Sequence, residues 1–554
     1  MTKRRILFCG EASWLSTGFA AYNREVIRAA HATDKYEIAE MGSYGSEQEK
    51  EAQALPWKFY GVLPTNPKEK EIYDSNPNNA FGVYKIDAVL ADFQPDIVFD
   101  ARDPWMSQHL QSSKFRDCFK LILMPTVDSA PQRRDWIKNI FLKCDAVTTY
   151  SRYGKKVLES DGVKVTDVTS PGVDLEKFKP LDRVETRDKY QIKPSLLIIG
   201  TVMRNQKRKL YPELFEVYSK LRAKYRMTKK NQNDGKVIRV KHSALLCHTS
   251  WPDNGWDIPW LLERYGLARH VIFTYKCESC SEVFHSWFIP CNPKGMGKCR
   301  ICGENTAHMP STHSGVSQEQ LIEIYNLMDI YVQPAICEGW GLPIMEAKAC
   351  GVPGLYQDYS AMEDHVQNGG GLPIKIGRFY TEAETMAIRS LPDNVDFLKK
   401  LEKLCVEGRY RAKLAKQARR CAVKLHDWAV TTNKFETIFD SIETHNRDET
   451  WDRQPKFLYM SEENPPSDLS NEDFVHWCYT NILCRRADDK GFGDWMETLS
   501  KGGSREAIEQ FFRNEIIGQN IFEEMRWNNS LKTRGLTPED QQVKEPNVLP
   551  GALV

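Results

Sequence analysis

The chain has no long hydrophobic run, since no stretch of its 554 residues approaches the roughly 18 apolar residues that a membrane-spanning helix needs. It also has no excess of either charge, because 76 basic and 75 acidic residues give a formal net charge of +1. A nucleic-acid or membrane partner would therefore have to meet a local patch. Short-period repeats and long low-complexity tracts are absent, and the 41% hydrophobic content indicates globular domains with apolar cores.

The N-terminal segment is a poor match to a secretory signal peptide, because its apolar part spans only Ile6 to Cys9 before Gly10-Glu11. A first buried strand explains these residues better. Without such a leader, the 15 cysteines are expected to be reduced thiols and metal ligands rather than disulfides. We therefore expect a cytoplasmic protein without a transmembrane segment.

Short apolar runs alternate with helical patterns along most of the chain, which predicts α/β domains with parallel, doubly wound sheets. A first set of expected strands covers 5–10, 96–101, 121–126 and 146–151, with a helix over 18–31. A second set covers 195–202, 242–249, 270–275, 329–334 and 352–357. Two Rossmann-like domains that face a cleft at the carboxyl ends of their strands fit this arrangement.

The chain is too long for one domain, since roughly 150 residues per domain suggest three or four units. We expect an N-terminal Rossmann-like domain over 1–185 and a second over 186–425, interrupted by a cysteine-rich insertion at 277–303. A crossover helix over 426–445, a proline-bearing linker over 446–470, a helical accessory domain over 471–530 and a tail over 531–554 follow.

The strongest functional signal is CEGWGLPIMEAKACGVP, Cys337 to Pro353. Glycines allow the backbone to approach a ligand closely, and Pro343 suits the first turn of a helix. The N-terminus of that helix is a ready phosphate site. Glu338 and Glu346 could then bind hydroxyl groups on both sides of a diphosphate. The alternative is a glycine-rich turn with one surface Glu and one capping Glu.

This motif resembles the donor site of retaining GT-B glycosyltransferases of family 4, and the resemblance covers roughly residues 1–445. Other matching segments occur in the family's order: SWLSTGFAAY (13–22), SPGVDLEKFKP (170–180), GTVMRNQKRKL (200–210) and SQEQLIEIYNLMDIYVQP (317–334). The resemblance implies a GT-B fold and transfer of a sugar from a nucleotide-diphosphate sugar with retention at the anomeric carbon. The departing phosphate would help to deprotonate the acceptor.

The resemblance also implies residue roles. Arg204 and Lys209 match the basic pair that holds the donor diphosphate, Glu346 the carboxylate on the ribose hydroxyls, and Glu338 the one on the transferred sugar. Cations are required because the leaving group is a diphosphate, and no catalytic metal is expected. The remaining residues expected at the donor are Gly18, Gly339, Trp340, Gly341 and Leu342.

Two points in these assignments stay open. Lys207 and Arg208 flank the basic pair and could substitute for it, and in isolation RNQKRK would be a solvated basic turn. The family often has a histidine near the sugar, where this sequence has DARDPWMSQHL (100–110). Asp103 could bind a sugar hydroxyl or orient the acceptor, or could simply form a turn before proline. Asp128 is a weaker candidate of the same kind.

Cys277-x2-Cys280 and Cys299-x2-Cys302, eighteen residues apart, have the spacing of a four-cysteine structural zinc site. The alternative is four unmetallated thiols, and Cys291 and His285 are not expected to bind. The insertion follows the strand at 270–275, so it should lie on the rim of the cleft. Its cationic and aromatic residues could help to hold an acceptor: Phe284, Trp287, Phe288, Lys294, Lys298 and Arg300.

Residues 471–516 resemble a small helical domain of unknown function that is appended to bacterial and phage surface or carbohydrate-related proteins. Apolar spacing alone would make it a packing unit. The acceptor is expected to be a glycan or a lipid-linked saccharide. A hydroxymethylated base in DNA is an alternative, because residues 221–241 concentrate positive charge. A catalytically silent sugar- or nucleic-acid-binding protein is a further one. Donor sugar and oligomeric state are not indicated.

Overall fold

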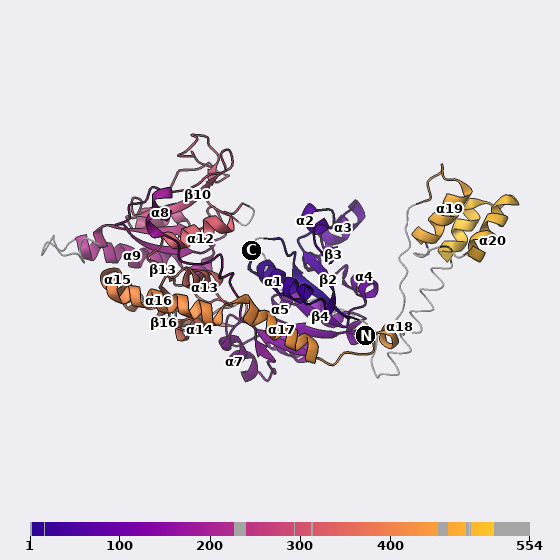
Figure 1. Cartoon of the computed structure of the whole chain (residues 1–554), viewed down its shortest axis with the longest axis horizontal. Coiled ribbons are helices and arrows are strands. Elements are labelled where there is room, and N and C mark those ends of the chain that lie inside the picture. Colours follow the sequence, from indigo (N-terminus) through magenta and orange to yellow (C-terminus); the bar gives the residue numbers. More distant parts are fainter. Residues whose placement is uncertain are drawn as a thin grey trace.

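The computed structural model describes residues 3–514 except 16, 227–239, 293, 312–313, 453–463, 483–486 and 488. Two α/β domains dominate the molecule, and a helical unit with its own core follows them (Figure 1). The predicted α/β class is therefore confirmed. Among the described helices, none combines the length and the apolar character that crossing a membrane demands.

The first domain contains a seven-stranded, fully parallel sheet in the order β3-β2-β1-β4-β5-β6-β7. The predicted strands in this part of the chain are all present. Its strands are β1 (Arg4–Glu11), β2 (Tyr36–Ser43), β3 (Lys58–Gly61), β4 (Ile97–Asp100), β5 (Lys120–Leu123), β6 (Ala146–Thr149) and β7 (Asp167–Val168).

Strand β2 was not predicted, because the acidic residues Glu37 and Glu40 interrupt its apolar pattern. Glu40 is nevertheless fully buried. The backbone N–H and hydroxyl of Ser13 and the indole N–H of Trp57 donate to its carboxylate at 2.8–2.9 Å. A buried carboxylate is tolerated when it is hydrogen-bonded in this way.

The second domain contains a sheet in the order β11-β10-β9-β8-β13-β14-β15, with β12 paired to β10. Its six strands from β10 to β15 in this order run parallel, and β11 from the insertion and β12 just after it are antiparallel to β10. The strands are β8 (Leu197–Val202), β9 (Ser243–His248), β10 (Val271–Cys277), β11 (Val283–Ser286), β12 (Ala307–His308), β13 (Ile330–Gln333), β14 (Gly354–Gln357) and β15 (Gly371–Ile374). A separate hairpin joins β16 (Ile376–Thr381) to β17 (Ile388–Pro392).

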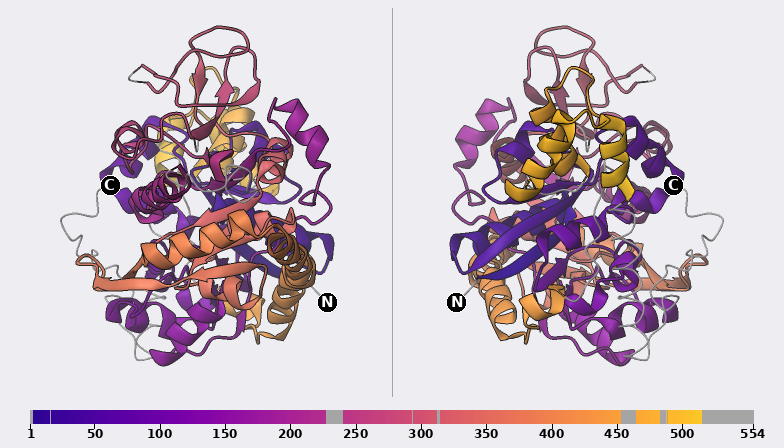
Figure 2. Two further views of the ribbon diagram at one scale, coloured as in Figure 1. Left: turned by 90° about the vertical axis from the view of Figure 1, so that its left-hand side faces the viewer. Right: turned by 90° about the vertical axis from the view of Figure 1, so that its right-hand side faces the viewer.

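Helices surround the two sheets (Figures 1 and 2). In the first domain they are α1 (Gly18–Ala32), α2 (Lys50–Gln53), α3 (Pro67–Ser75), α4 (Ile86–Phe93), α5 (Pro104–Ser112), α6 (Arg134–Asn139) and α7 (Arg152–Ser160). Those that follow are α8 (Arg183–Lys189), α9 (Tyr211–Arg226), α11 (Ile258–Arg264), α12 (Gln318–Leu327), α13 (Leu342–Ala349), α14 (Met362–Gln367), α15 (Asn394–Val406), α16 (Gly408–Leu425) and α17 (Trp428–Ser441).

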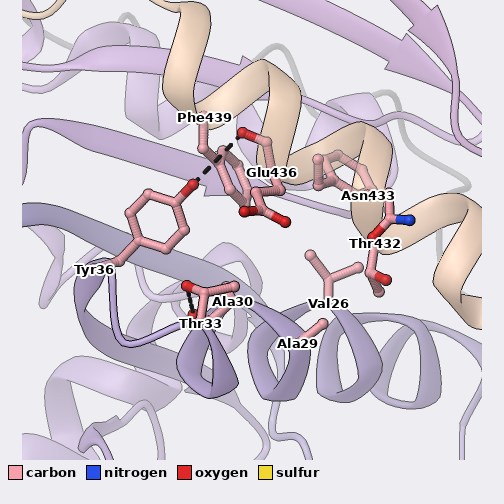
Figure 3. A pocket seen from close by; sticks show the side chains of 10 residues that line it. Val26, Ala29, Ala30, Thr33, Tyr36, Thr432, Asn433, Glu436 and Phe439 are labelled. Atoms are coloured by element: carbon pink, nitrogen blue, oxygen red, sulfur yellow. Dashed lines mark hydrogen bonds between the residues drawn. The ribbon is translucent and has the colours of Figure 1, made fainter.

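The chain crosses between the domains twice, and the two crossings lie side by side. Val173 donates its backbone N–H to the His426 carbonyl at 2.8 Å, and Val173 and Asp427 form a parallel bridge. After this point α17 packs against α1 of the first domain. A small cavity of about 110 Å³ remains between these two helices, where the Tyr36 hydroxyl donates to the Glu436 carbonyl at 3.5 Å (Figure 3).

The segment predicted as a linker contains α18 (Arg447–Asp452), which buries Trp451 in the core of the first domain. The helical unit that follows comprises α19 (Asn471–Trp477), a π-helical turn at 478–482, α20 (Asp489–Ser500) and helical residues 505–514. Its core is formed by Phe474, Val475, Cys478, Tyr479, Ile482, Leu499, Ile508 and Phe512. The predicted tail over 531–554 lies outside the described residues.

The double crossing generates a prediction at Gly172. A Cβ added there would lie 2.5 Å from the Cα of Trp428, and relieving that clash would require the backbone to shift. Gly172→Ala should lower the free energy of unfolding by about 1–3 kcal/mol, the usual range for overpacking. Urea denaturation measures this. Gly315→Ala is the control, because its Cβ would meet only the Ser311 carbonyl, at 3.9 Å. Equal midpoints for the two variants would contradict the expected clash.

Candidate functional site

The Cys337–Pro353 motif connects β13 to α13 and has the predicted local geometry. Gly341 is the N-cap of α13 with a φ of 96°, and Pro343 lies in the first helical turn. A Cβ on Gly339 would lie 2.4 Å from the Thr126 methyl carbon of the first domain. A Cβ on Gly18 would lie 3.4 Å from Leu342. The glycines therefore let the two domains meet at this loop, which brings Gly18 to the same place as the motif.

Glu338 is the most extensively bound side chain of the motif and is 5% exposed. Arg208 donates to its Oε2 at 2.9 Å, and Lys209 donates to its Oε1. The Gln333 amide donates to Oε1 at 2.7 Å, and the backbone N–H of Glu338 donates to the Ser360 hydroxyl at 2.9 Å. The carboxylate is thus held in one orientation at the start of α13.

The pKa values in this group follow from burial and mutual charge. Burial raises the pKa of Glu338, but Arg208 and Lys209 outweigh burial and hold it at about 2. Burial and the neighbouring Arg208 lower the pKa of Lys209 to about 8, against the attraction of Glu338. At neutral pH the group therefore carries one negative and two positive charges, and the surplus cation suits a phosphate.

Arg204 does not join this group. Its guanidinium forms a bidentate ion pair with Asp253, at 2.9 and 3.0 Å, and its side chain is 44% exposed. Lys207 is exposed. Within the predicted basic turn, Lys209 therefore contacts Glu338 as expected. The second cation on Glu338 is Arg208, which the sequence analysis named only as a possible substitute, and not Arg204.

Glu346, the second carboxylate of the motif, lies one turn into α13 and is half-buried. The Tyr325 hydroxyl donates to its Oε2 at 2.6 Å. Burial raises the pKa of Glu346, and the Tyr325 hydrogen bond opposes that shift. Trp340 is buried against His365, with ring centroids 4.5 Å apart. Its indole N–H has no partner among the described residues. Tyr325, Gln333 and Ser360 carry no spacing signal that would have found them from sequence.

The first domain contributes carboxylates opposite this loop. Asp103 is the N-cap residue of α5, directly after β4. Burial raises the pKa of Asp103 to about 6, the Thr126 hydroxyl opposes this shift, and the nearby Asp128 adds to it. Arg208 of the second domain is also close enough to influence Asp103. His109, in contrast, is buried inside the first domain, and burial lowers its pKa to about 3.

Asp128 forms an ion pair across the domain boundary. Arg389, from the β16–β17 hairpin, donates to Asp128 Oδ1 at 3.0 Å and to the Cys337 sulfur at 3.0 Å. The Ile388 N–H donates to the Ala130 carbonyl at 2.8 Å. The hairpin therefore ties the loop after β5 to the residue that precedes Glu338. Sequence reasoning missed Arg389, because it belongs to neither the motif nor the basic turn.

The four predicted cysteines form one cluster at the end of β10. The Cys277 and Cys302 sulfurs are 3.6 Å apart, the Cys280 and Cys299 sulfurs are 3.9 Å apart, and all four lie within 4.8 Å of one another. Tetrahedral zinc with Zn–S bonds of about 2.3 Å requires sulfur separations of about 3.8 Å. The donor set therefore fits a closed, structural zinc site. Figure 2 shows this insertion as the protruding loops at the top of both views.

A hollow of about 590 Å³ lies beside the cluster. Its lining includes three of the residues expected to hold an acceptor, Phe288, Lys298 and Arg300. Phe284 cannot contact an acceptor at this surface, because it is buried and stacks on Tyr275 with ring centroids 5.6 Å apart. Cys291 forms a backbone bridge with Gly297, and the four-cysteine group does not include it.

Comparisons with known proteins agree with this geometry. The model of the family "Glycosyl transferases group 1" matches residues 301–420, which contain the Cys337–Pro353 motif. A domain of unknown function, DUF4214, matches residues 459–514. No curated protein matches the chain.

Solved structures match both α/β domains. The sucrose-phosphate synthase of Thermosynechococcus elongatus is similar over 79% of this chain and 98% of its own, with 14% identity and a TM-score of 0.52. Anabaena HepE, in complex with UDP and glucose, is similar over 79% of this chain and 100% of its own, with 11% identity and a TM-score of 0.54. A glycosyltransferase of Rickettsia africae is similar over 79% of this chain and 98% of its own, with 16% identity and a TM-score of 0.52.

The fold is GT-B. The predicted fold class is thereby confirmed, and the match over 301–420 lies in the second GT-B domain. In this frame the Glu338 group lies at the carboxyl ends of three neighbouring strands, β8, β13 and β14, where open α/β sheets bind ligands.

The buried charge group generates a prediction for stability. Lys209→Met should lower the free energy of unfolding by about 3–5 kcal/mol, because it leaves a buried carboxylate short of one cation. Adding Glu338→Gln should recover part of this loss. Arg204→Met, which removes an exposed pair, should cost about 0–1 kcal/mol. Denaturation of the wild type, Lys209→Met, Glu338→Gln, the double variant and Arg204→Met measures the coupling, and additive losses of the two single variants would contradict the shared charge.

The same group predicts the direction of acid sensitivity. Because folding depresses the pKa of Glu338 to about 2, its stabilising contribution is present above the unfolded value of about 4.3 and is lost as pH falls towards 2. Glu338→Gln should flatten the stability profile across this window.

The cysteine cluster predicts one zinc ion per chain. Metal analysis of the purified full-length protein should return about one equivalent, and Cys280→Ser should lower both metal content and thermal stability. Cys291→Ser is the matched control and should retain the metal. A wild-type protein that keeps its melting temperature after complete chelation would contradict a structural role.

Proposed function

We propose that the protein is a cytoplasmic glycosyltransferase that transfers a sugar from a nucleotide-diphosphate sugar to a hydroxyl acceptor, with retention at the anomeric carbon. The observation that carries this proposal is Glu338, held by Arg208 and Lys209 at the N-terminus of α13 inside the segment that matches group 1 glycosyl transferases. A phosphate-binding helix end, two cations and an adjacent oriented carboxylate are the parts that sugar-nucleotide chemistry requires.

The donor would lie along the Cys337–Pro353 loop. Arg208 and Lys209 would hold the diphosphate together with the backbone amides of residues 340–342. Glu346 would bind the ribose hydroxyls once Tyr325 shares or releases it, and Glu338 would bind hydroxyls of the transferred sugar. UDP-glucose is the first donor to test, because HepE binds it within the same fold.

The reaction would break the bond between the anomeric carbon and the diphosphate oxygen and form a bond to the acceptor oxygen on the same face. The acceptor proton would pass to the departing diphosphate. Arg208 and Lys209 would stabilise the negative charge that develops on that leaving group. The zinc site would hold the insertion in shape, and a closed four-thiolate ion offers no open position for chemistry.

The acceptor would be a glycan or a lipid-linked saccharide. Asp103 gives the acceptor side a carboxylate that Arg389 does not neutralise, as it does Asp128, and a carboxylate suits hydroxyl groups better than the phosphates of a polyanion. The basic stretch 221–241 that motivated a DNA acceptor lies mostly outside the described residues. A DNA acceptor is therefore included as an alternative in the acceptor screen described below.

Donor use should depend on both motif carboxylates. Glu346→Gln should weaken binding of UDP-glucose by about 10–100-fold, as the loss of a charged hydrogen bond does. Lys209→Ala should lower kcat by about 100–1,000-fold, because it removes a cation from the leaving group. Glu319→Gln, an exposed residue of α12, is the control.

A screen of nucleotide sugars against saccharide and hydroxymethylated DNA acceptors, with products measured by mass, tests the proposal directly. Transfer that is unaffected by Glu346→Gln and Lys209→Ala would refute the donor-site assignment. Binding of donors without transfer or hydrolysis under any condition would favour a silent sugar-binding protein.

A further inference from the structure

The exposed face of α16 carries an unusual concentration of positive charge. The helix has 18 residues, seven of them Lys or Arg and none Asp or Glu, in a chain whose net charge is only +1. Its opposite face is buried in the second domain through Leu414, Ala418, Cys421 and Ala422. Along the lower side of the molecule in Figure 1, α15, α16 and α17 follow one another.

Five of the cations form one continuous stripe, because they recur every three or four residues. At about 100° per residue they fall within an arc of about 80°, on the side of the helix opposite the buried residues. With a rise of 1.5 Å per residue the stripe is about 22 Å long. All five are exposed: Arg409, Lys413, Lys416, Arg420 and Lys424.

Internal structure does not account for this stripe. The other two cations of α16 have structural contacts: Arg411 donates to the Leu404 carbonyl at 2.6 Å, and Arg419 to the carbonyls of Phe178 and Ala349 at 2.7 and 2.8 Å. No acidic side chain in the described part of the chain pairs with any of the five. Like charges one turn apart destabilise a helix, so the stripe opposes the stability of α16.

The side chains beside the stripe indicate which class of anionic partner it binds. Exposed aliphatic side chains lie at its C-terminal end, where Val423 is 51% exposed, Leu425 38% and Val430 of α17 42%. Within α16 the one aromatic residue is Tyr410, which is half-buried with the Lys403 ammonium over its ring at 4.2 Å, so the helix presents no exposed ring for stacking on bases. Cations flanked by aliphatic groups suit anionic lipid headgroups above an acyl layer.

We propose that the Arg409–Lys424 stripe holds the protein against an anionic lipid surface. Attraction between basic residues and acidic headgroups falls off within a screening length, so the association should be reversible and sensitive to salt. The exposed Lys403 of α15, which lies over the ring of Tyr410, adds a further cation beside the N-terminal end of the stripe. This inference does not depend on the proposed transfer reaction.

The test is sedimentation of the full-length protein with vesicles of phosphatidylcholine alone or with phosphatidylglycerol. We expect binding to the mixed vesicles only. It should fall at least tenfold between about 0.1 M and about 1 M salt, as the screening length shrinks from about 10 Å to about 3 Å. Lys413→Glu/Lys416→Glu/Arg420→Glu should abolish it, and Lys413→Arg/Lys416→Arg/Arg420→Lys should retain it.

A charge-matched control separates the stripe from total charge. Lys164→Glu/Lys179→Glu/Lys193→Glu changes three exposed lysines elsewhere and should leave vesicle binding intact. Circular dichroism melting checks that the variants fold. Absent binding to anionic vesicles, or equal loss in both triple variants, would overturn the proposal. So would a salt-sensitive shift of duplex DNA that only the stripe variant abolishes while vesicles stay unbound.

Discussion

The structure of the site depends on one buried carboxylate. A charge with 5% exposure is stable only when opposite charges and hydrogen bonds surround it, and Glu338 obtains these from the ends of three neighbouring strands. Arg208 and Lys209 follow β8, Gln333 ends β13, and Ser360 follows β14. The carboxylate therefore ties the loop after β8 to the end of β13, and the backbone N–H of the same residue ties the loop after β14 to them. The surplus of cations over anions in that group is what a diphosphate would use.

The two domains contact each other on both sides of this group. Gly339 meets Thr126, Leu342 meets Gly18, and the Asp128–Arg389 pair joins the hairpin to the first domain. The chain itself crosses at Gly172 and Trp428, where backbone meets backbone. Because these contacts involve small residues and short bonds, a shift of either domain would change the surroundings of Glu338 directly. Domain arrangement and site geometry are therefore coupled.

The sequence predicts the parts of the molecule whose physics is local. Buried runs such as β1 and β8 and the Pro343 helix start follow from apolar pattern and backbone chemistry. Contacts between residues that are distant in the sequence could not be predicted in this way. Strand β2 could not be predicted from its own residues, because the indole N–H of Trp57, seventeen residues away, donates the hydrogen bond that allows Glu40 to be buried. Nothing within RNQKRK distinguishes the inward Lys209 from Arg204, because Asp253, which captures Arg204, lies in the loop after β9.

The cysteine insertion has a consequence for solubility. Strand β10 would be the edge of the second sheet if β11 and β12 did not pair with it, and β10 ends at Cys277 of the four-cysteine cluster. An open edge offers unpaired backbone groups to other chains, and a short covering strand is a common protection. Disruption of the four-cysteine cluster would loosen that cover and leave an apolar strand free to pair between molecules. The integrity of this cluster would then govern self-association as well as stability.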